Sequence, residues 1–213
     1  MKINLLCDNK SSWFWNSNHN FIEQIKELGH DVNVYISEFD MPSAEISVFI
    51  SCTKLVSADG LKKSNSNIIC HPSDLPEGRG FSPIAWDILK GKEKITFSLF
   101  EADIGADTGF IYDKKIVNLV GTELSDDLRK IQADVTYDMV LDYIIKYPDN
   151  KSYAQEGEGS WYRKRTPKDS ELDVNKTIKE QINLLRIVDN DLYPAFFFFK
   201  DEKFVITIRK KDN

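Results

Sequence analysis

The first residue that could do chemistry is a histidine at the end of an apolar run. The stretch IICHPSDLPEGRGFSP, residues 68–83, runs from Ile68, Ile69 and Cys70 directly into His71, and a loop rich in proline and glycine follows. An imidazole with an ordinary pKa of about 6.5 can gain and lose protons near neutral pH, so His71 is a candidate acid–base catalyst. A histidine before a proline can equally be the ordinary end of a strand, and both interpretations stay open from these residues alone.

A second polar stretch, EADIGADTGFIY at residues 101–112, contains Asp107 and overlaps the end of the predicted strand 94–102. A carboxylate beside an imidazole fixes the tautomer of the ring and favours its protonated form, so an aspartate that the fold brought close to His71 would assist it. Aspartate and glycine are also frequent in turns, so Asp107 could instead serve only to shape a loop.

The surrounding pattern predicts elements that would place both residues at one edge of a sheet. Amphipathic segments at 18–28 and 54–64 separate apolar runs, and this alternation is typical of an α/β, Rossmann-like, mostly parallel sheet. Such sheets bind ligands at the carboxyl ends of their strands, where His71 lies and which Asp107 follows. The predicted strands are residues 2–8, 31–37, 46–51, 67–71 and 94–102.

The second half of the chain is expected to form further helices and a small C-terminal helix-plus-hairpin appendage. A polar connector, residues 148–175, is too long for a plain loop, and we expect it to be mobile or functional. We therefore predict a catalytic domain at 1–150, and a substrate-contacting connector with the appendage at 151–213. The predicted helices are residues 82–91, 123–147 and 176–188, and the predicted hairpin is 195–211.

Charge and composition narrow the class of protein. The 213 residues are 41% hydrophobic and 29% charged, which is typical of a soluble globular chain, and the net charge of −6 disfavours a nucleic-acid partner. The longest apolar run, AFFFF at residues 195–199, is too short to span a membrane, and the N-terminus lacks the apolar run of a signal peptide. Three cysteines without paired spacing and three histidines without ligand spacing predict reduced thiols, a cytoplasmic location and no metal.

Four stretches together resemble one enzyme family. HPSDLPEGRGFSPIAWDILKG (71–91) and EADIGADTGFIY (101–112) resemble the formyltransferases that use 10-formyltetrahydrofolate. WYRKRTPKDSELD (161–173) and LLRIVDNDLYPAFF (184–197) resemble the matching segments of the methionyl-tRNA and sugar enzymes of that family. Within the family, the sequences of these stretches are most similar to sugar-nucleotide N-formyltransferases of the PseJ type, which act on a UDP-linked 4-amino sugar in pseudaminic acid biosynthesis.

The resemblance implies that His71 moves protons during formyl transfer and that Asp107 orients and charges its imidazole. One position departs from the family, because Ile69 stands where an asparagine usually steadies the oxyanion. Asn67 is the nearest asparagine, but at about 3.3 Å per residue it would lie roughly 13 Å from His71 along a strand. Ser73, a backbone amide of the following turn or the protonated histidine itself is expected to replace that donor.

Two loops of the family hold the folate donor, and the matching residues here are expected to do the same. The backbone of residues 101–107 would hold the pterin ring, and the 75–82 loop would line the reacting centre. The donor-binding residues that the resemblance implies are Leu75, Pro76, Arg79, Gly80, Ala102, Asp103, Gly105 and Asp107.

A small amine is the expected formyl acceptor, because the chain ends before a tRNA-binding barrel could follow and is too acidic to supply one. The segment WYRKR, residues 161–165, offers aromatic rings for the base of a nucleotide-linked amino sugar and cations for its diphosphate. A solvated basic run whose two aromatics pack on the core is an equally open alternative. The candidate substrate-binding residues are Trp13, Trp161, Tyr162, Arg163, Arg165 and Asp169.

Two other functions stay open. Hydrolysis of formyltetrahydrofolate needs only water in place of the amine, and Ile69 in place of an asparagine would suit a catalytically weak folate-binding protein. We expect a monomer or homodimer that binds no metal, nucleic acid or membrane.

Overall fold

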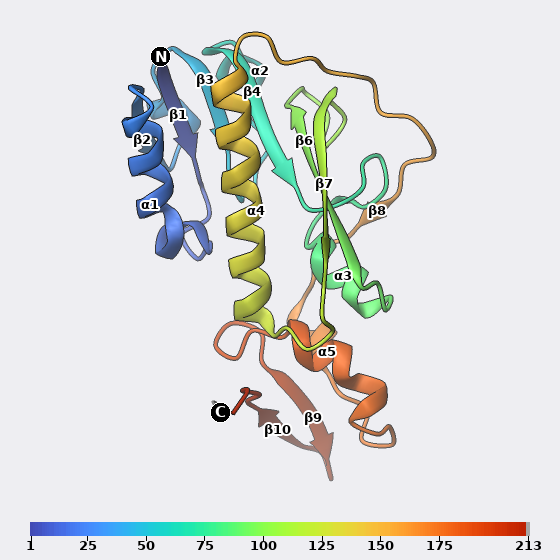
Figure 1. The fold of residues 1–213 in the computed structure, drawn as a ribbon. Coiled ribbons are helices and arrows are strands. Elements are labelled where there is room, and N and C mark those ends of the chain that lie inside the picture. Colours follow the sequence, from blue (N-terminus) through green and yellow to red (C-terminus); the bar gives the residue numbers. More distant parts are fainter. Residues whose placement is uncertain (212–213) are drawn as a thin grey trace.

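A six-stranded sheet forms the centre of the protein in a computed structural model that describes residues 1–211 (Figure 1). Its strands are β1 (Lys2–Leu6), β2 (Asp31–Tyr35), β3 (Ala44–Phe49), β4 (Ser64–His71), β6 (Lys94–Glu101) and β7 (Ile111–Asn118). The strands lie in the order β2-β1-β3-β4-β6-β7. The first four run parallel, whereas β6 is antiparallel to β4 and β7 is antiparallel to β6. The predicted α/β, mostly parallel sheet is confirmed.

Two long helices cover one face of this sheet. α1 (Phe14–Glu27) and α4 (Ser125–Lys146) lie in front of the strands in Figure 1. Phe21 of α1 stacks on Tyr137 of α4, with ring centroids 4.3 Å apart. Phe14, Phe21 and Ile25 recur at helical spacing, and their burial packs α1 against the sheet.

The opposite face carries shorter elements. Leu5 packs with the helical core described above, whereas the next residue, Leu6, packs with Met41 and Phe49 on the other side of the sheet, as strand alternation requires. The 3-10 turn η1 (Glu38–Asp40) and the single helical turn α2 (Ala58–Leu61) follow β2 and β3. The predicted amphipathic segment 54–64 is therefore mostly loop.

Two further elements differ from the sequence prediction. β7 is not among the predicted strands, and it carries charged residues from Asp113 to Lys115, which an edge strand tolerates. The predicted helix at 176–188 is shorter and consists of the 3-10 turn η3 (Lys179–Gln181) and α5 (Ile182–Ile187). The Gln181 side chain bonds the backbone of Asp173 at both N and O, which ties the preceding residues into a loop.

The C-terminal hairpin, β9 (Ala195–Phe199) and β10 (Glu202–Ile206), forms a separate two-stranded sheet near the N-terminal end of α4 (Figure 1). Its link to the body is α5, where the buried Arg186 Nη2 lies 3.0 Å from Oε2 of the buried Glu123. Burial alone would raise the pKa of Glu123, but the backbone amides of Val120 and Gly121 and the Arg186 guanidinium together lower it. The division at residue 150 stays a prediction, and residues 212–213 of the predicted appendage lie outside the described range.

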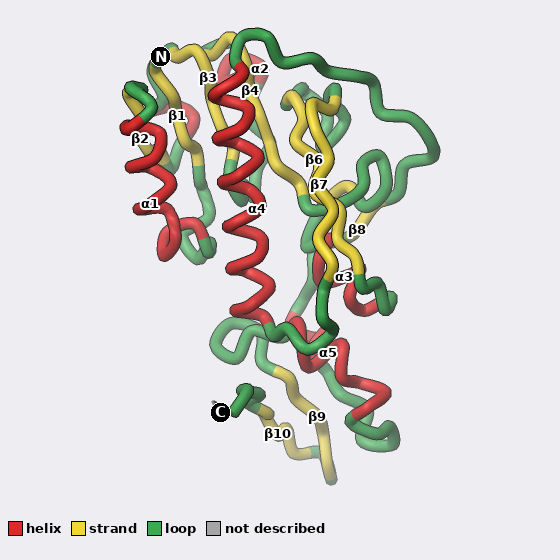
Figure 2. The backbone as a smooth tube through the Cα atoms, viewed as in Figure 1, coloured by secondary structure: helices red, strands yellow, loops and turns green. Residues whose placement is uncertain are grey.

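The connector after α4 returns to the loop that follows His71. Residues 148–160 leave α4, pass outside β6 and β7 and reach β8 (Trp161–Tyr162) without a helix or strand of their own (Figure 2). Tyr153 and Ile111 exchange two backbone hydrogen bonds on the way, and β8 then pairs in parallel with β5 (Arg79–Gly80). Within residues 1–211, none of the helices combines the length and apolar character that a bilayer crossing needs, and no three His, Cys, Asp or Glu side chains gather in a metal-binding cluster.

Candidate active site

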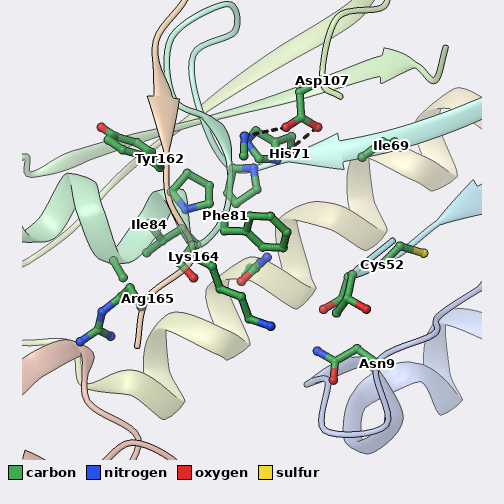
Figure 3. Close-up of a pocket in the computed structure, with 18 of the residues that line it drawn as sticks. Asn9, Cys52, Ile69, His71, Phe81, Ile84, Asp107, Tyr162, Lys164 and Arg165 are labelled. Carbon is green, nitrogen blue, oxygen red and sulfur yellow. Dashed lines mark hydrogen bonds and ion pairs between the residues drawn. The ribbon is translucent and has the colours of Figure 1, made fainter. Parts of the chain in front are cut away.

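The structure brings His71 and Asp107 together at the carboxyl end of β4. His71 is the last residue of β4, and its ring Nδ1 lies 3.9 Å from Oδ1 of Asp107 (Figure 3). The other ring nitrogen, Nε2, lies 2.9 Å from the carbonyl oxygen of Gly78. A carbonyl oxygen only accepts hydrogen bonds, so Nε2 carries a hydrogen and donates it.

This tautomer makes the pair a proton acceptor. With its hydrogen on Nε2, a neutral His71 presents the lone pair of Nδ1 towards the Asp107 carboxylate, so that two acceptors face each other. A proton taken up at Nδ1 would convert this arrangement into an ion pair with Asp107. Both side chains are largely buried, with 9% and 14% of their surface exposed, so water screens the interaction little.

Asp107 occupies a strained position in the loop between β6 and β7. Its backbone φ is 56°, in the left-handed region, and its Oδ2 accepts a 2.8 Å hydrogen bond from the Gly80 amide. Asp103 shapes the same loop, because its Oδ1 accepts hydrogen bonds from the Gly105 amide and the Thr108 hydroxyl. The loop closes so tightly that a Cβ on Gly109 would lie 1.6 Å from the carbonyl oxygen of Glu101.

Strand β8 packs against the loop that contains Gly78 and Gly80, whose backbones bond His71 and Asp107. A Cβ on Gly80 would lie 2.5 Å from the Tyr162 carbonyl oxygen, and one on Gly78 would lie 2.9 Å from the Tyr162 ring. Both glycines also have positive φ, so the close approach of β8 requires glycine at these positions. Tyr162 is itself anchored, since its hydroxyl donates a 2.6 Å hydrogen bond to the buried Asp87 of α3 (Pro83–Leu89).

A cleft of about 1380 Å³ opens beside the His71–Asp107 pair. A pocket for one drug-sized ligand measures about 300–1,000 Å³, so this cleft is larger than an ordinary single-ligand pocket. Cys52 also lines it, but burial raises the pKa of its thiol to about 12, which keeps it from acting as a thiolate nucleophile. The sequence-predicted site residues that line the cleft are Trp13, His71, Gly80, Ala102, Asp103, Gly105, Asp107, Trp161, Tyr162, Arg163 and Arg165.

Five sequence-predicted site residues lie outside the cleft lining. Ser73 is buried, and its hydroxyl has no hydrogen-bond partner within residues 1–211. Leu75 belongs to a small apolar cluster with Phe100 and Ile111. The five are Ser73, Leu75, Pro76, Arg79 and Asp169.

Both arginines of the basic segment have structural partners. Asp169 accepts a bidentate pair of hydrogen bonds from Arg163, and this contact lowers the pKa of the Asp169 carboxyl group. Arg165 donates to the carbonyl oxygens of Ile187 and Asp169, and burial lowers the pKa of its guanidinium group. Lys164 between them is exposed, lines the cleft and lies 6.0 Å from the centroid of the Phe81 ring. Lys164 is therefore the cation of this segment most available to a ligand.

Ile69, which stands where the family usually has an asparagine, lies in the cleft. It lines the cleft two residues before His71 and, like Ala102, packs against the cluster of Leu6, Met41 and Phe49. The Asn67 side chain is directed elsewhere, because its Nδ2 donates to the Leu61 carbonyl oxygen at 2.9 Å. Asn67 therefore makes a structural contact away from the reacting pair.

Sequence reasoning missed the far end of the cleft. Arg129 of α4 forms an ion pair there with Asp189, which follows α5, and Tyr193 lines the cleft beside them. Arg129 and Asp189 are 60 residues apart in the chain, so no local pattern signals their contact. Only the docking of α5 against the body brings them together.

Comparison with known proteins gives consistent matches. The family model described as formyl transferase matches residues 17–144. Methionyl-tRNA formyltransferase of Ruminiclostridium cellulolyticum is 26% identical over 191 residues, which cover 85% of this chain and 54% of that protein. The chain thus spans about half the length of that relative.

Two solved structures share the fold. Methionyl-tRNA formyltransferase from Clostridium thermocellum has a TM-score of 0.79 and 23% identity, and the match covers 95% of this chain and 90% of that one. A sugar N-formyltransferase from Shewanella sp. has a TM-score of 0.69 and 17% identity, with 100% and 99% of the two chains covered.

Proposed function

The chain belongs to the formyl transferase family, and we propose that it moves a formyl group from 10-formyltetrahydrofolate to the amino group of a nucleotide-linked amino sugar. The observation that carries this proposal is the buried His71–Asp107 pair, which lines a cleft of about 1380 Å³. The matched segment, residues 17–144, includes both residues of the pair.

In the proposed reaction, the sugar nitrogen forms a bond to the formyl carbon, and the bond from that carbon to the folate nitrogen breaks. 10-formyltetrahydrofolate supplies the formyl group. The sugar nitrogen must lose a proton and the folate nitrogen must gain one. His71 takes up the first proton at Nδ1, Asp107 stabilises the resulting imidazolium, and the same proton is then available to the leaving nitrogen. A positioned acid–base group of this kind contributes about 10²- to 10⁴-fold in rate.

The folate donor is assigned to the part of the cleft beside the 102–107 loop. Ala102, Asp103 and Gly105 line it with small side chains and backbone, which can meet the polar edge of a pterin ring. Asp103 already bonds the Gly105 amide and the Thr108 hydroxyl, so we assign its side chain to holding the loop. Gly80 closes this part of the cleft from the other loop.

The sugar acceptor is assigned to the part of the cleft beside β8. Trp161 and Tyr162 offer rings for a nucleobase, and Lys164 offers a charge for the diphosphate. The match to a sugar N-formyltransferase over 99% of that chain supports this acceptor class. We propose a UDP- or dTDP-linked 4-amino-4,6-dideoxy sugar, as used in biosynthesis of the pseudaminic acid type.

The proposed reaction predicts a defined product. Incubation with 10-formyltetrahydrofolate and UDP- or dTDP-linked 4-amino-4,6-dideoxy sugars is expected to add one formyl group to the sugar, as measured by mass spectrometry. Formate release at the same rate without any amine would instead identify a formyltetrahydrofolate hydrolase. Folate binding in calorimetry with neither product would identify a folate-binding protein without turnover.

Replacing Lys164 by alanine is expected to raise KM for the nucleotide sugar about tenfold, because a charge-assisted hydrogen bond contributes about 1.5–3 kcal/mol. The value of kcat is expected to stay within about threefold, since Lys164 contacts the substrate away from the reacting atoms. Steady-state kinetics with the sugar varied measures both constants. Lys168→Ala is the matched control, because Lys168 is exposed on the same segment outside the cleft lining. Equal changes in KM for the two variants would contradict this assignment of Lys164.

A further inference from the structure

We propose that Gln155 is a positioning residue that holds Asp107 in register with His71, an inference that rests on the formyl transfer proposed above. Gln155 lies in the connector between α4 and β8. It is half-buried, whereas residues 151–154 and 156–160 on either side are exposed. A single inward-facing residue in an otherwise exposed segment indicates a specific contact.

The contacts of Gln155 use both ends of its amide group. Nε2 donates two hydrogen bonds of 2.9 Å, one to the carbonyl oxygen of Asp107 and one to that of Gly109. Oε1 accepts a 2.7 Å hydrogen bond from Nη2 of Arg79. Because two carbonyls require donors and a guanidinium requires an acceptor, these partners fix the orientation of the amide.

The two carbonyl contacts bracket the strained backbone of the proposed catalytic carboxylate. Asp107 has a φ of 56°, a conformation that side chains other than glycine rarely adopt. Gly109 cannot relieve the strain by moving towards β6, because it is already in close contact with the carbonyl of Glu101. The backbone hydrogen bonds from Gln155 therefore hold Asp107 where its Oδ1 faces Nδ1 of His71.

The hydrogen bond from Arg79 to Gln155 also links Gln155 to the loop that bonds His71. Arg79 stands between Gly78, whose carbonyl accepts the hydrogen bond from His71, and Gly80, whose amide binds Asp107. Gln155 thus joins the loop after β4 to the loop after β6. Loss of this link would let the two loops shift relative to each other, and a misplacement of about 1 Å at reacting groups can lower a rate about 10²-fold.

Gln155→Glu tests this inference without changing the size of the side chain. A glutamate keeps an acceptor for Arg79 but has no hydrogen to donate to the two carbonyls. We expect kcat to fall about 10- to 100-fold, while KM for each substrate changes less than about threefold. Glu156→Gln makes the reverse change at the adjacent exposed position and is expected to leave kcat unchanged. A folded Gln155→Glu variant with kcat within about threefold of wild type would overturn the proposal.

A double-mutant cycle separates positioning from general support of the fold. If Gln155 acts through the carboxylate, Gln155→Glu is expected to lower kcat less than about threefold in an Asp107→Asn background. The same 10- to 100-fold loss in both backgrounds would overturn the proposal, because it would show that the two residues act independently.

A readout without turnover keeps this inference distinct from the proposed function. The chain has only three histidines, so the ring signals of His71 can be assigned in NMR spectra by comparison with a His71→Gln variant. Gln155→Glu is expected to move these signals, and Glu156→Gln is expected to leave them in place. Gln155→Met, which removes all three hydrogen bonds without adding charge, replaces the glutamate variant if that variant does not fold. Unmoved His71 signals would overturn the proposal, whereas moved signals without formyl transfer by the wild type would support positioning and contradict only the proposed reaction.

Discussion

His71→Gln is expected to lower kcat for formyl transfer about 10³-fold. The glutamine amide can still donate a hydrogen bond to the Gly78 carbonyl, but it cannot take up a proton from the attacking amine. Asp107→Asn is expected to have a similar effect, because it keeps the shape of the side chain and removes the charge that stabilises the imidazolium. Single-turnover measurements with saturating donor and acceptor report the chemical step directly.

Two controls accompany this prediction. His19→Gln changes an exposed histidine of α1 outside the cleft lining and is expected to leave kcat unchanged. The double variant of His71 and Asp107 is expected to lose little more activity than either single variant, because the two residues act as one unit. A His71→Gln enzyme within about tenfold of wild type would remove the histidine from the mechanism.

Arg186→Met is expected to lower the free energy of unfolding by about 3 kcal/mol. The substitution removes the partner of a buried carboxylate and also the hydrogen bond from Arg186 Nε to the Glu123 carbonyl oxygen. Glu123 keeps its bonds from the Val120 and Gly121 amides, which limits the loss. Urea unfolding followed by circular dichroism measures the change.

Lys210→Met is the matched control. The pair of Lys210 with Asp127 also ties the C-terminal segment to the start of α4, but both side chains are about half exposed, at 48% and 46%. An exposed pair of this kind contributes less than about 1 kcal/mol. Equal losses in the two variants would contradict a special role for the buried pair.

The buried pair of Glu123 and Arg186 also predicts that stability depends on pH. The folded pKa of Glu123 is lowered, so its contribution is fully present above the unfolded pKa of about 4.3 and is lost as the pH falls through the folded value. The difference in stability between wild type and Arg186→Met is therefore expected to shrink below about pH 4.

The sequence predicts the sheet because its signals are local, whereas the pairing of His71 with Asp107 is implied by the family resemblance and is seen in the structure. Short apolar runs mark the strands, and their alternation with amphipathic segments indicates parallel order. In such a sheet the carboxyl ends of the strands share one edge, so a histidine ending β4 is expected near a ligand. The antiparallel β6 departs from that order, yet the loop after it still reaches His71, since Asp107 lies close to the imidazole.

The remaining features depend on contacts between distant parts of the chain. Nothing near Gln155 in the sequence indicates that its amide binds residues 107 and 109, because that contact exists only once the connector lies across the loop. The local sequence of WYRKR does not show that its arginines have partners, but Arg163 is paired with Asp169, and the half-buried Arg165 donates to the carbonyl oxygens of Ile187 and Asp169. Ser73 follows His71 closely in sequence, yet it is buried outside the cleft lining.

The place of the connector in the chain also limits when a newly synthesised protein can form its active site. All six strands of the sheet and both long helices lie before residue 147, so they can assemble while the rest is still being translated. Residues 155–162 supply the contacts that shape both loops of the reacting pair, and they emerge from the ribosome only afterwards. A nascent protein can therefore form its sheet and long helices before the residues that surround its imidazole are available.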